Sequence, residues 1–173
     1  SSSRFGVRYS PQGSIFDVAG SSLFGENLGY VLGLLGSKVA YYLLQLINPT
    51  MNYQIRDIKA LPYIFDSFEA ERVKALTERC IAISAKEWNS RETSYRFFKN
   101  PLIQTSKGIP LQEATEKYIT AYNNSISELM KAATELNSIF IDMYGLGHIL
   151  SPRVCRDDIT LPDSDAKAVI KDL

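Results

Sequence analysis

The sequence predicts an α+β protein, in which a small β-rich N-terminal portion with two short buried helices precedes a long antiparallel helix pair. Three observations predict this class. Short alternations of apolar and polar residues before residue 66 indicate strands. An almost uninterrupted apolar run over 28–47 indicates buried helices, and apolar residues three and four apart over 66–143 indicate long amphipathic helices. We therefore expect segments 1–65, 66–150 and 151–173, the last with a short strand and a charged tail.

The composition is ordinary for a soluble domain and excludes several kinds of site. The 173 residues carry 19 basic and 19 acidic side chains, which disfavours a strongly electrostatic nucleic-acid binder but permits local basic patches. Two cysteines, Cys80 and Cys155, and one histidine, His148, provide neither a disulfide framework nor zinc-ligand spacing. The chain starts Ser-Ser-Ser-Arg, without a signal-peptide pattern, so we expect a cytoplasmic fragment of a larger protein.

The first element expected is a β-hairpin. Residues 5–9 and 14–18 have strand-like composition, and Pro11 and Gly13 lie between them at positions suited to a turn.

Two short buried helices are expected next, over about 28–35 and 38–47. Gly36 suits the end of the first helix and Ser37 suits the N-cap of the second. A membrane span is the alternative, but Lys38 in the middle of the apolar run disfavours insertion.

A polar turn and a strand with one polar face are expected over 48–62. Asn48-Pro49 is a turn pair, and Leu61-Pro62 would end the strand because proline cannot donate to a sheet. Between them, apolar and polar residues alternate loosely. The tail contains a weak echo of this stretch in Arg156-Asp157-Asp158-Ile159-Thr160-Leu161-Pro162, which predicts a second short strand.

Two amphipathic helices account for most of the middle segment. Asp66 is expected as the N-cap of a helix that ends near Trp88. A second helix is expected to start after Gly108-Ile109-Pro110 and to stop at Gly145 or Gly147. Its length of about nine turns predicts an antiparallel partner, in a packed pair of coiled-coil type.

The connector over 86–107 mixes basic and aromatic residues. It holds five positive and two negative side chains, with Trp88, Tyr95, Phe97 and Phe98 interleaved. Such a mixture suits a nucleic-acid backbone. The alternative is a connector whose aromatic residues fill the core and whose charges face water.

Catalytic motifs are absent from the sequence. It contains no glycine-rich phosphate loop, paired-carboxylate signature or nucleophile elbow. Asn48-Pro49-Thr50-Met51 partly matches the Asn-Pro-Pro-Tyr motif with which DNA amino-methyltransferases hold a flipped base. Met51 cannot stack as an aromatic ring does, so we expect no catalysis at this motif.

Several motifs nevertheless resemble one protein family. The likeness is carried by Leu32–Val39, by Asn48-Pro49-Thr50-Met51-Asn52-Tyr53-Gln54-Ile55 and by Asp57–Pro62. Two further stretches support it, Trp88–Ser94 and Glu135-Leu136-Asn137-Ser138-Ile139-Phe140-Ile141-Asp142-Met143-Tyr144-Gly145-Leu146, and the second of these is the most specific. Together they resemble the target-recognition region of DNA methyltransferases and type I specificity subunits. More narrowly, they are similar to the PglX family of adenine-specific methyltransferases of the BREX phage-defence system.

The resemblance implies a role and a set of partners. A parent enzyme of this family would methylate adenine in double-stranded DNA with S-adenosylmethionine, using a catalytic domain N-terminal to this chain. The chain itself would need no cofactor or metal and would help to choose the site, without acting as an enzyme alone. The family usually has asparagine in place of Gly36; both residues tolerate the left-handed conformation expected for that helix end.

Candidate DNA contacts follow from the polar chemistry of the side chains. Asn52 and Gln54 suit adenine edges, and Arg8 and Arg56 suit guanine edges. Phosphate contacts are expected from further cations, namely Lys38, Lys59, Arg91, Arg96 and Lys99. The alternative is a structural helical module that docks other defence-system proteins without touching DNA, which the balanced net charge favours.

Overall fold

A computed structural model describes residues 5–15, 20–50 and 52–161. Within these ranges every regular element is helical, and neither a strand nor a sheet is present. The α+β prediction is therefore wrong. The described chain forms two compact units. One unit combines the chain up to Glu78 with Ala133–Arg153, and the other combines Arg79–Ala132 with the chain from Val154. The three segments expected from the sequence stay a prediction.

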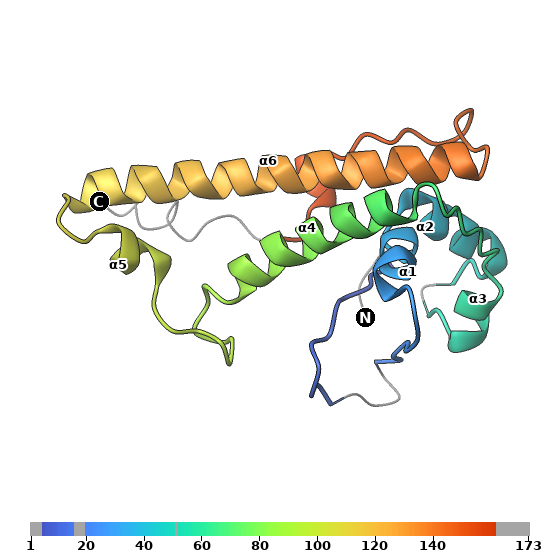
Figure 1. Cartoon of the computed structure of the whole chain (residues 1–173), viewed down its shortest axis with the longest axis horizontal. Coiled ribbons are helices and arrows are strands. Elements are labelled where there is room, and N and C mark those ends of the chain that lie inside the picture. The colour runs from blue at the N-terminus through green and yellow to red at the C-terminus, as the bar shows by residue number, and fades with distance from the viewer. Residues whose placement is uncertain (1–4, 16–19, 51, 162–173) are drawn as a thin grey trace. The chain divides into compact units, whose positions relative to one another are not determined.

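The two short apolar helices match their predicted bounds. Helix α1 spans Leu28–Leu35 and helix α2 spans Lys38–Ile47 (Figure 1). Ser37 caps α2 as expected, because its hydroxyl oxygen accepts a hydrogen bond from the backbone N–H of Ala40. Gly36 ends α1 in the right-handed region, with φ of −81°, so the left-handed conformation expected there is wrong.

No single helix among the described residues is long and apolar enough to cross a membrane. Helices α1 and α2 reach sufficient length and apolar composition only together, and they are bent by 68° relative to each other. Tyr30, Leu34, Val39, Ala40 and Leu44 are all buried in the first unit.

Gly33 allows α1 to approach two long helices in the first unit. Helix α4 spans Ala70–Trp88 and helix α6 spans Leu111–Met143. A Cβ atom added to Gly33 would lie 2.7 Å from the Thr77 hydroxyl oxygen on α4 and 3.4 Å from Leu136 Cδ2 on α6. Helix α1 therefore packs directly against both long helices in the first unit.

Ion pairs join the two long helices within each unit. Arg72 pairs with Glu135 in the first unit, and Arg79 pairs with Glu128 in the second. In the first unit α1 reaches both helices, which differs from the expected two-helix seam. Helix α4 begins at Ala70, later than expected, although Asp66 still accepts a hydrogen bond from the Phe68 N–H.

An extended segment between α1 and α4 is held by two tyrosine hydroxyl groups of the first unit. Tyr30 donates to the Ile64 carbonyl oxygen at 3.1 Å and accepts from the Asp66 N–H at 3.3 Å. Tyr144 donates to the Pro62 carbonyl oxygen at 2.6 Å and accepts from the Ile64 N–H. Burial raises the pKa of both phenols, so both remain protonated donors at neutral pH. Side chains thereby replace the neighbouring strand that this extended backbone lacks.

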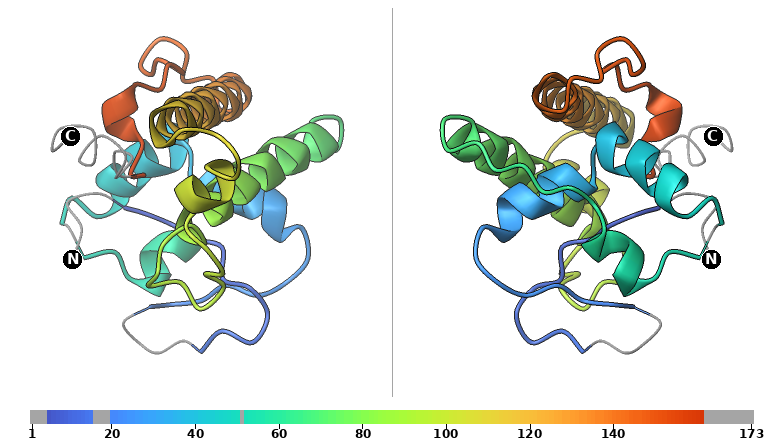
Figure 2. Two further views of the ribbon diagram at one scale, coloured as in Figure 1. Left: turned by 90° about the vertical axis from the view of Figure 1, so that its left-hand side faces the viewer. Right: turned by 90° about the vertical axis from the view of Figure 1, so that its right-hand side faces the viewer.

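The predicted hairpin and the two further predicted strands are absent from the residues that the structure describes, for identifiable reasons. Residues 5–15 form only a turn, in which the Ser14 N–H donates to the Pro11 carbonyl oxygen, and residues 16–18 lie outside the described chain. The 48–62 stretch contains the short helix α3, Ile55–Lys59, in the place of a strand (Figure 2). The tail forms a 3₁₀ turn over Arg156–Asp158, and the Arg156 guanidinium donates to the carbonyls of Ile159 and Leu161. Local side-chain contacts satisfy this backbone in place of a sheet.

Candidate functional site

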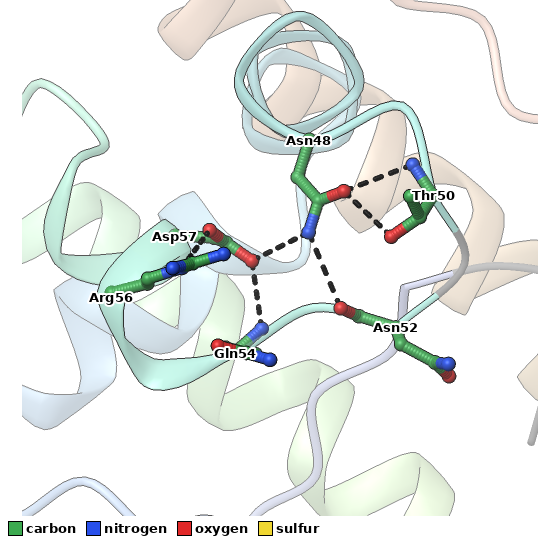
Figure 3. Close-up of polar contacts among 6 residues, drawn as sticks. All are labelled: Asn48, Thr50, Asn52, Gln54, Arg56 and Asp57. Carbon is green, nitrogen blue, oxygen red and sulfur yellow. Dashed lines mark hydrogen bonds and ion pairs between the residues drawn. The ribbon is translucent and has the colours of Figure 1, made fainter.

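The candidate site is the Asn48–Lys59 segment, which links the end of α2 to α3 in the first unit. The Asn48 side chain organises it (Figure 3). Its Nδ2 donates to Asp57 Oδ2 at 2.7 Å and to the Asn52 carbonyl oxygen at 3.3 Å. Its Oδ1 accepts from the backbone N–H and the hydroxyl group of Thr50, at 3.0 and 2.6 Å. We call these four contacts the Asn48 clamp.

The Asn48 clamp uses the full hydrogen-bonding capacity of the amide, which has two donor hydrogens and two acceptor positions. A nucleobase amine would have to displace one of these intrachain partners to bind there. The geometry gives Asn48 the role of closing a loop, which differs from the amine-holding role of the methyltransferase motif.

Asp57 is the buried partner of the clamp and explains why α3 is a helix. It is the third residue of α3, and its carboxylate accepts a 2.8 Å hydrogen bond from the Gln54 N–H at the helix start. A carboxylate in the first helical turn also interacts favourably with the helix dipole. The hydrogen bonds from Gln54 and then Asn48 hold the pKa of Asp57 below its ordinary value of 3.8.

The outer surface of the segment carries the candidate base-reading groups. Asn52, Gln54, Arg56 and Lys59 are all exposed, while Asp57 is only 5% exposed. The Arg56 side chain, 79% exposed, has its Nε 3.5 Å from Asp57 Oδ1. The amide groups can both donate to and accept from polar edges, whereas the guanidinium group can only donate. The clamp fixes the backbone that carries them.

The N-terminal candidate lies on a segment that reaches this site. The rings of Phe5 and Tyr53 meet edge to face, with centroids 5.4 Å apart. Arg8 follows three residues after Phe5 and is exposed, and its guanidinium donates to the Val7 carbonyl oxygen. The structure thus brings the segment that carries Arg8 into contact with the segment that carries Asn52, Gln54 and Arg56, and neither of the two is a strand in the described residues.

Lys38 lies in a different environment. Its ammonium group donates to the carbonyl oxygens of Ser151 and Arg153, and its backbone N–H donates to the buried Asn137 side chain. The Asn137 amide in turn donates to the Pro152 carbonyl oxygen. These contacts fasten residues 151–153 to the start of α2, so the ammonium group already has a structural role.

The three remaining candidates for phosphate contact, Arg91, Arg96 and Lys99, belong to the second unit. Arg91 is paired with Glu87 through two guanidinium nitrogens, whereas Arg96 is exposed and lies over the Tyr95 ring. Lys99 is half-buried and precedes the short helix α5, Pro101–Thr105. In the described part of the chain, no group of His, Cys, Asp and Glu side chains is placed to hold a metal ion.

Comparison with known proteins identifies relatives over nearly the whole chain. No protein-family model matches it. The adenine-specific methyltransferase PglX of Lacticaseibacillus casei is 32% identical over 178 aligned positions, covering 99% of this chain. The adenine-specific methyltransferase BrxX of Escherichia coli is 30% identical over 150 positions, covering 84%. The chain is therefore similar in sequence to a segment of each of these two adenine-specific methyltransferases.

The similarity concerns a small part of each methyltransferase. The chain corresponds to 15% of the length of PglX and 12% of the length of BrxX. The family expected from the sequence motifs is supported, while the role of this segment within such a methyltransferase stays a prediction.

Sequence reasoning missed the pair that organises the site, Asn48 and Asp57. A usable signal was present, because Asp57 follows Gln54 by three residues, the spacing of a helix cap and an acidic third residue. Ile55 and Ile58 are also three apart, which fits a helix as well as a loose alternation. No sequence signal pointed to the contact between Phe5 and Tyr53.

Proposed function

We propose that this chain is a DNA target-recognition segment of an adenine-specific DNA methyltransferase of the BREX phage-defence type. The parent enzyme would work in the cytoplasm on double-stranded DNA. The observation that carries the proposal is the exposed group on the Asn48–Lys59 segment, in a chain related to adenine-specific methyltransferases. Two amides and two cations face outward there from a backbone that the Asn48 clamp holds in place.

The chemistry of these side chains matches the edges of base pairs. The amides of Asn52 and Gln54 suit N6 and N7 of adenine, and the guanidinium groups of Arg56 and Arg8 suit O6 and N7 of guanine. Lys59, Arg91, Arg96 and Lys99 supply charge for phosphates, which fix position without reading sequence. Lys38 contributes less in this proposal because its ammonium group is bonded to two carbonyls.

The proposal assigns methyl transfer to another domain of the parent protein. The sequence has no glycine-rich loop suited to S-adenosylmethionine. The amide of Asn48 in its Asn-Pro motif is already hydrogen-bonded to groups of the same chain. Its residues do not fit that cofactor, so the cofactor and the catalytic residues would lie in the remainder of the methyltransferase.

A second candidate function is a docking module for other defence-system proteins without DNA contact. Two observations favour it: the net charge is zero, and Tyr63, Ile64 and Phe65 are exposed side by side on the extended segment of the first unit. An apolar strip of this kind suits a protein surface.

A fluorescence titration of the 173-residue chain against labelled duplex DNA, at low and moderate salt, separates the two functions. DNA recognition predicts binding that weakens as salt rises, because phosphate contacts release counterions. Arg56→Ala in the complete methyltransferase should relax or weaken methylation of its site, whereas Lys59→Ala should weaken binding to all sequences alike. An absence of salt-dependent binding, together with unchanged methylation by a stable Arg56→Ala enzyme, would refute direct recognition and favour docking.

A further inference from the structure

The Ser94–Lys99 segment of the second unit is a hydrogen-bonded loop, fixed from within by a buried serine. Ser94 is only 5% exposed. Its hydroxyl donates to Asn89 Oδ1 at 2.8 Å and accepts from the Arg96 N–H at 3.2 Å. The backbone adds bonds from the Ser94 N–H to the Arg91 carbonyl and from the Phe97 N–H to the Ser94 carbonyl.

The far end of the loop is fixed by the start of α5. The Asn100 side chain caps α5 by accepting from the Leu102 N–H at 2.9 Å. The Gln104 amide donates to the Lys99 carbonyl oxygen at 3.1 Å. Both ends of the loop are therefore held by side chains, and its backbone is set independently of the residues at its centre.

Large aromatic side chains point away from this fixed backbone. Phe98 is 91% exposed and Tyr95 is 75% exposed. An aromatic side chain can bury roughly 150–250 Å² of surface, and burying that surface stabilises a fold or a complex. These two rings bury little of it in their unit, so core packing does not account for them.

Cations alternate with the aromatic residues in the loop. The Arg96 guanidinium carbon lies 5.4 Å from the centre of the Tyr95 ring, and Lys99 follows Phe98. Residues 91–107 hold four positive side chains and one negative one. A purely hydrophobic partner would leave these charges unmatched, whereas a nucleic-acid strand offers both phosphates and flat apolar faces.

We propose that Tyr95 and Phe98 stack on unpaired DNA bases while Arg96 and Lys99 hold the neighbouring phosphates. This inference rests on the proposed function in DNA recognition. Paired bases inside a duplex are covered on both faces by their neighbours, so exposed rings can stack only where a base is unpaired or extruded. An enzyme that acts on adenine inside a duplex must take that base out of the stack, and this creates unstacked faces near its site.

The test is a binding titration of the 173-residue chain with two duplexes of equal length, one fully matched and one with three unpaired adenines. The wild-type chain should bind the unpaired duplex more tightly. Phe98→Ala and Tyr95→Ala should each lower that preference about fivefold to 150-fold, the range expected for one base–aromatic stack. Phe98→Trp should retain it.

Phe68→Ala is the matched control, because Phe68 is 96% exposed in the first unit and lies outside the loop. It should leave both affinities unchanged, and circular dichroism should show equal helix content in all variants. Equal affinity of the wild-type chain for the two duplexes, or full preference in Phe98→Ala and Tyr95→Ala, would overturn the inference while salt-dependent binding still supports the proposed function. Loss of salt-dependent binding to both duplexes would overturn both.

Discussion

The side-chain amide of Asn48 donates a 2.7 Å hydrogen bond to the carboxylate of Asp57, nine residues later in the chain. This bond joins the end of α2 to the first turn of α3. It also places a buried carboxylate beneath an exposed, polar outer surface. The stability of the candidate site therefore depends on an amide–carboxylate pair that carries a single negative charge.

Asn48→Asp should destabilise the first unit at neutral pH. The replacement has the same shape, but it sets a second carboxylate against Asp57 and removes the donor, so the two charges repel. The loss of stability relative to the wild-type chain should shrink as pH falls, because a carboxyl group that becomes protonated can donate a hydrogen bond to the other one. Urea unfolding of both proteins at pH 7 and pH 4.5 measures this difference.

In the wild-type chain, the contribution of Asp57 to stability depends on pH in the direction opposite to that expected for the Asn48→Asp variant. The folded-state pKa of Asp57 is lowered, so its contribution is fully present above its ordinary value of 3.8 and is lost as pH falls through the lowered value. Asp142→Asn, at an exposed aspartate of α6, is the control and should change stability little. A deficit for Asn48→Asp that stays constant between the two pH values would contradict the repulsion argument.

Gly33→Ala should lower the free energy of unfolding by about 1–3 kcal/mol, as overpacking of a core does. The added methyl group would lie 2.7 Å from the Thr77 hydroxyl oxygen and 3.1 Å from Val73 Cγ1. Chemical denaturation followed by circular dichroism measures the change. Gly29→Ala in the same helix is the control, since its nearest neighbour would be Lys74 Cγ at 3.4 Å. Alanine should be tolerated there or add up to about 1 kcal/mol from helix propensity.

Tyr30→Phe should lower the free energy of unfolding by about 1–3 kcal/mol, because the Ile64 carbonyl and the Asp66 N–H lose a buried hydrogen-bond partner. The ring contacts with Tyr63, Phe65 and Phe140 would remain. Thermal unfolding of the variant checks the loss. Tyr41→Phe removes a hydroxyl that accepts only an exposed contact from Gln45, and it should have almost no effect. Equal effects of the two substitutions would show that Tyr30 acts through its ring alone.

The two cysteines should differ strongly in reactivity. Burial raises the pKa of Cys80 to about 11, whereas the Cys155 side chain is exposed. At pH 8 a disulfide reagent should therefore modify Cys155 quickly and Cys80 slowly, because the thiolate is the reactive species. Kinetics of the Cys80→Ser and Cys155→Ser variants separate the two thiols, and denaturant should abolish the difference. Rapid modification of Cys80 in the native chain would mean that its part of α4 opens readily.

Four of the helices, α1, α2, α4 and α6, were predictable from local sequence, whereas α3 and α5 were not. The bounds of α1 and α2 followed from Gly36 and Ser37, and the end of α6 followed from Gly145, which has φ of +66°. These positions are determined within a few residues of the chain. Amphipathic spacing was equally reliable for α4 and α6, since it extends over many turns.

The strands were mispredicted because a short alternation does not specify its own partners. A strand needs a neighbouring edge for its N–H and C=O groups. In the Asn48–Lys59 segment, Asp57 satisfies the backbone locally, and in the 62–66 segment two tyrosine hydroxyls come from far along the chain. Asn52, Gln54 and Arg56, which were chosen from the chemistry of their side chains, are exposed, and their role in DNA contact stays a prediction. The clamp that supports them could not be inferred without the fold.

The close approach of Gly33 to Thr77 also constrains how this sequence can diverge. The two positions share one small space, so a side chain gained at the first has to be compensated by volume lost at the second. Thr77→Ala should therefore rescue part of the loss caused by Gly33→Ala. Among relatives as distant as 30–32% identity, we expect these two positions to change together, and such coupled change would record the packing of α1 on α4 in the family's evolutionary history.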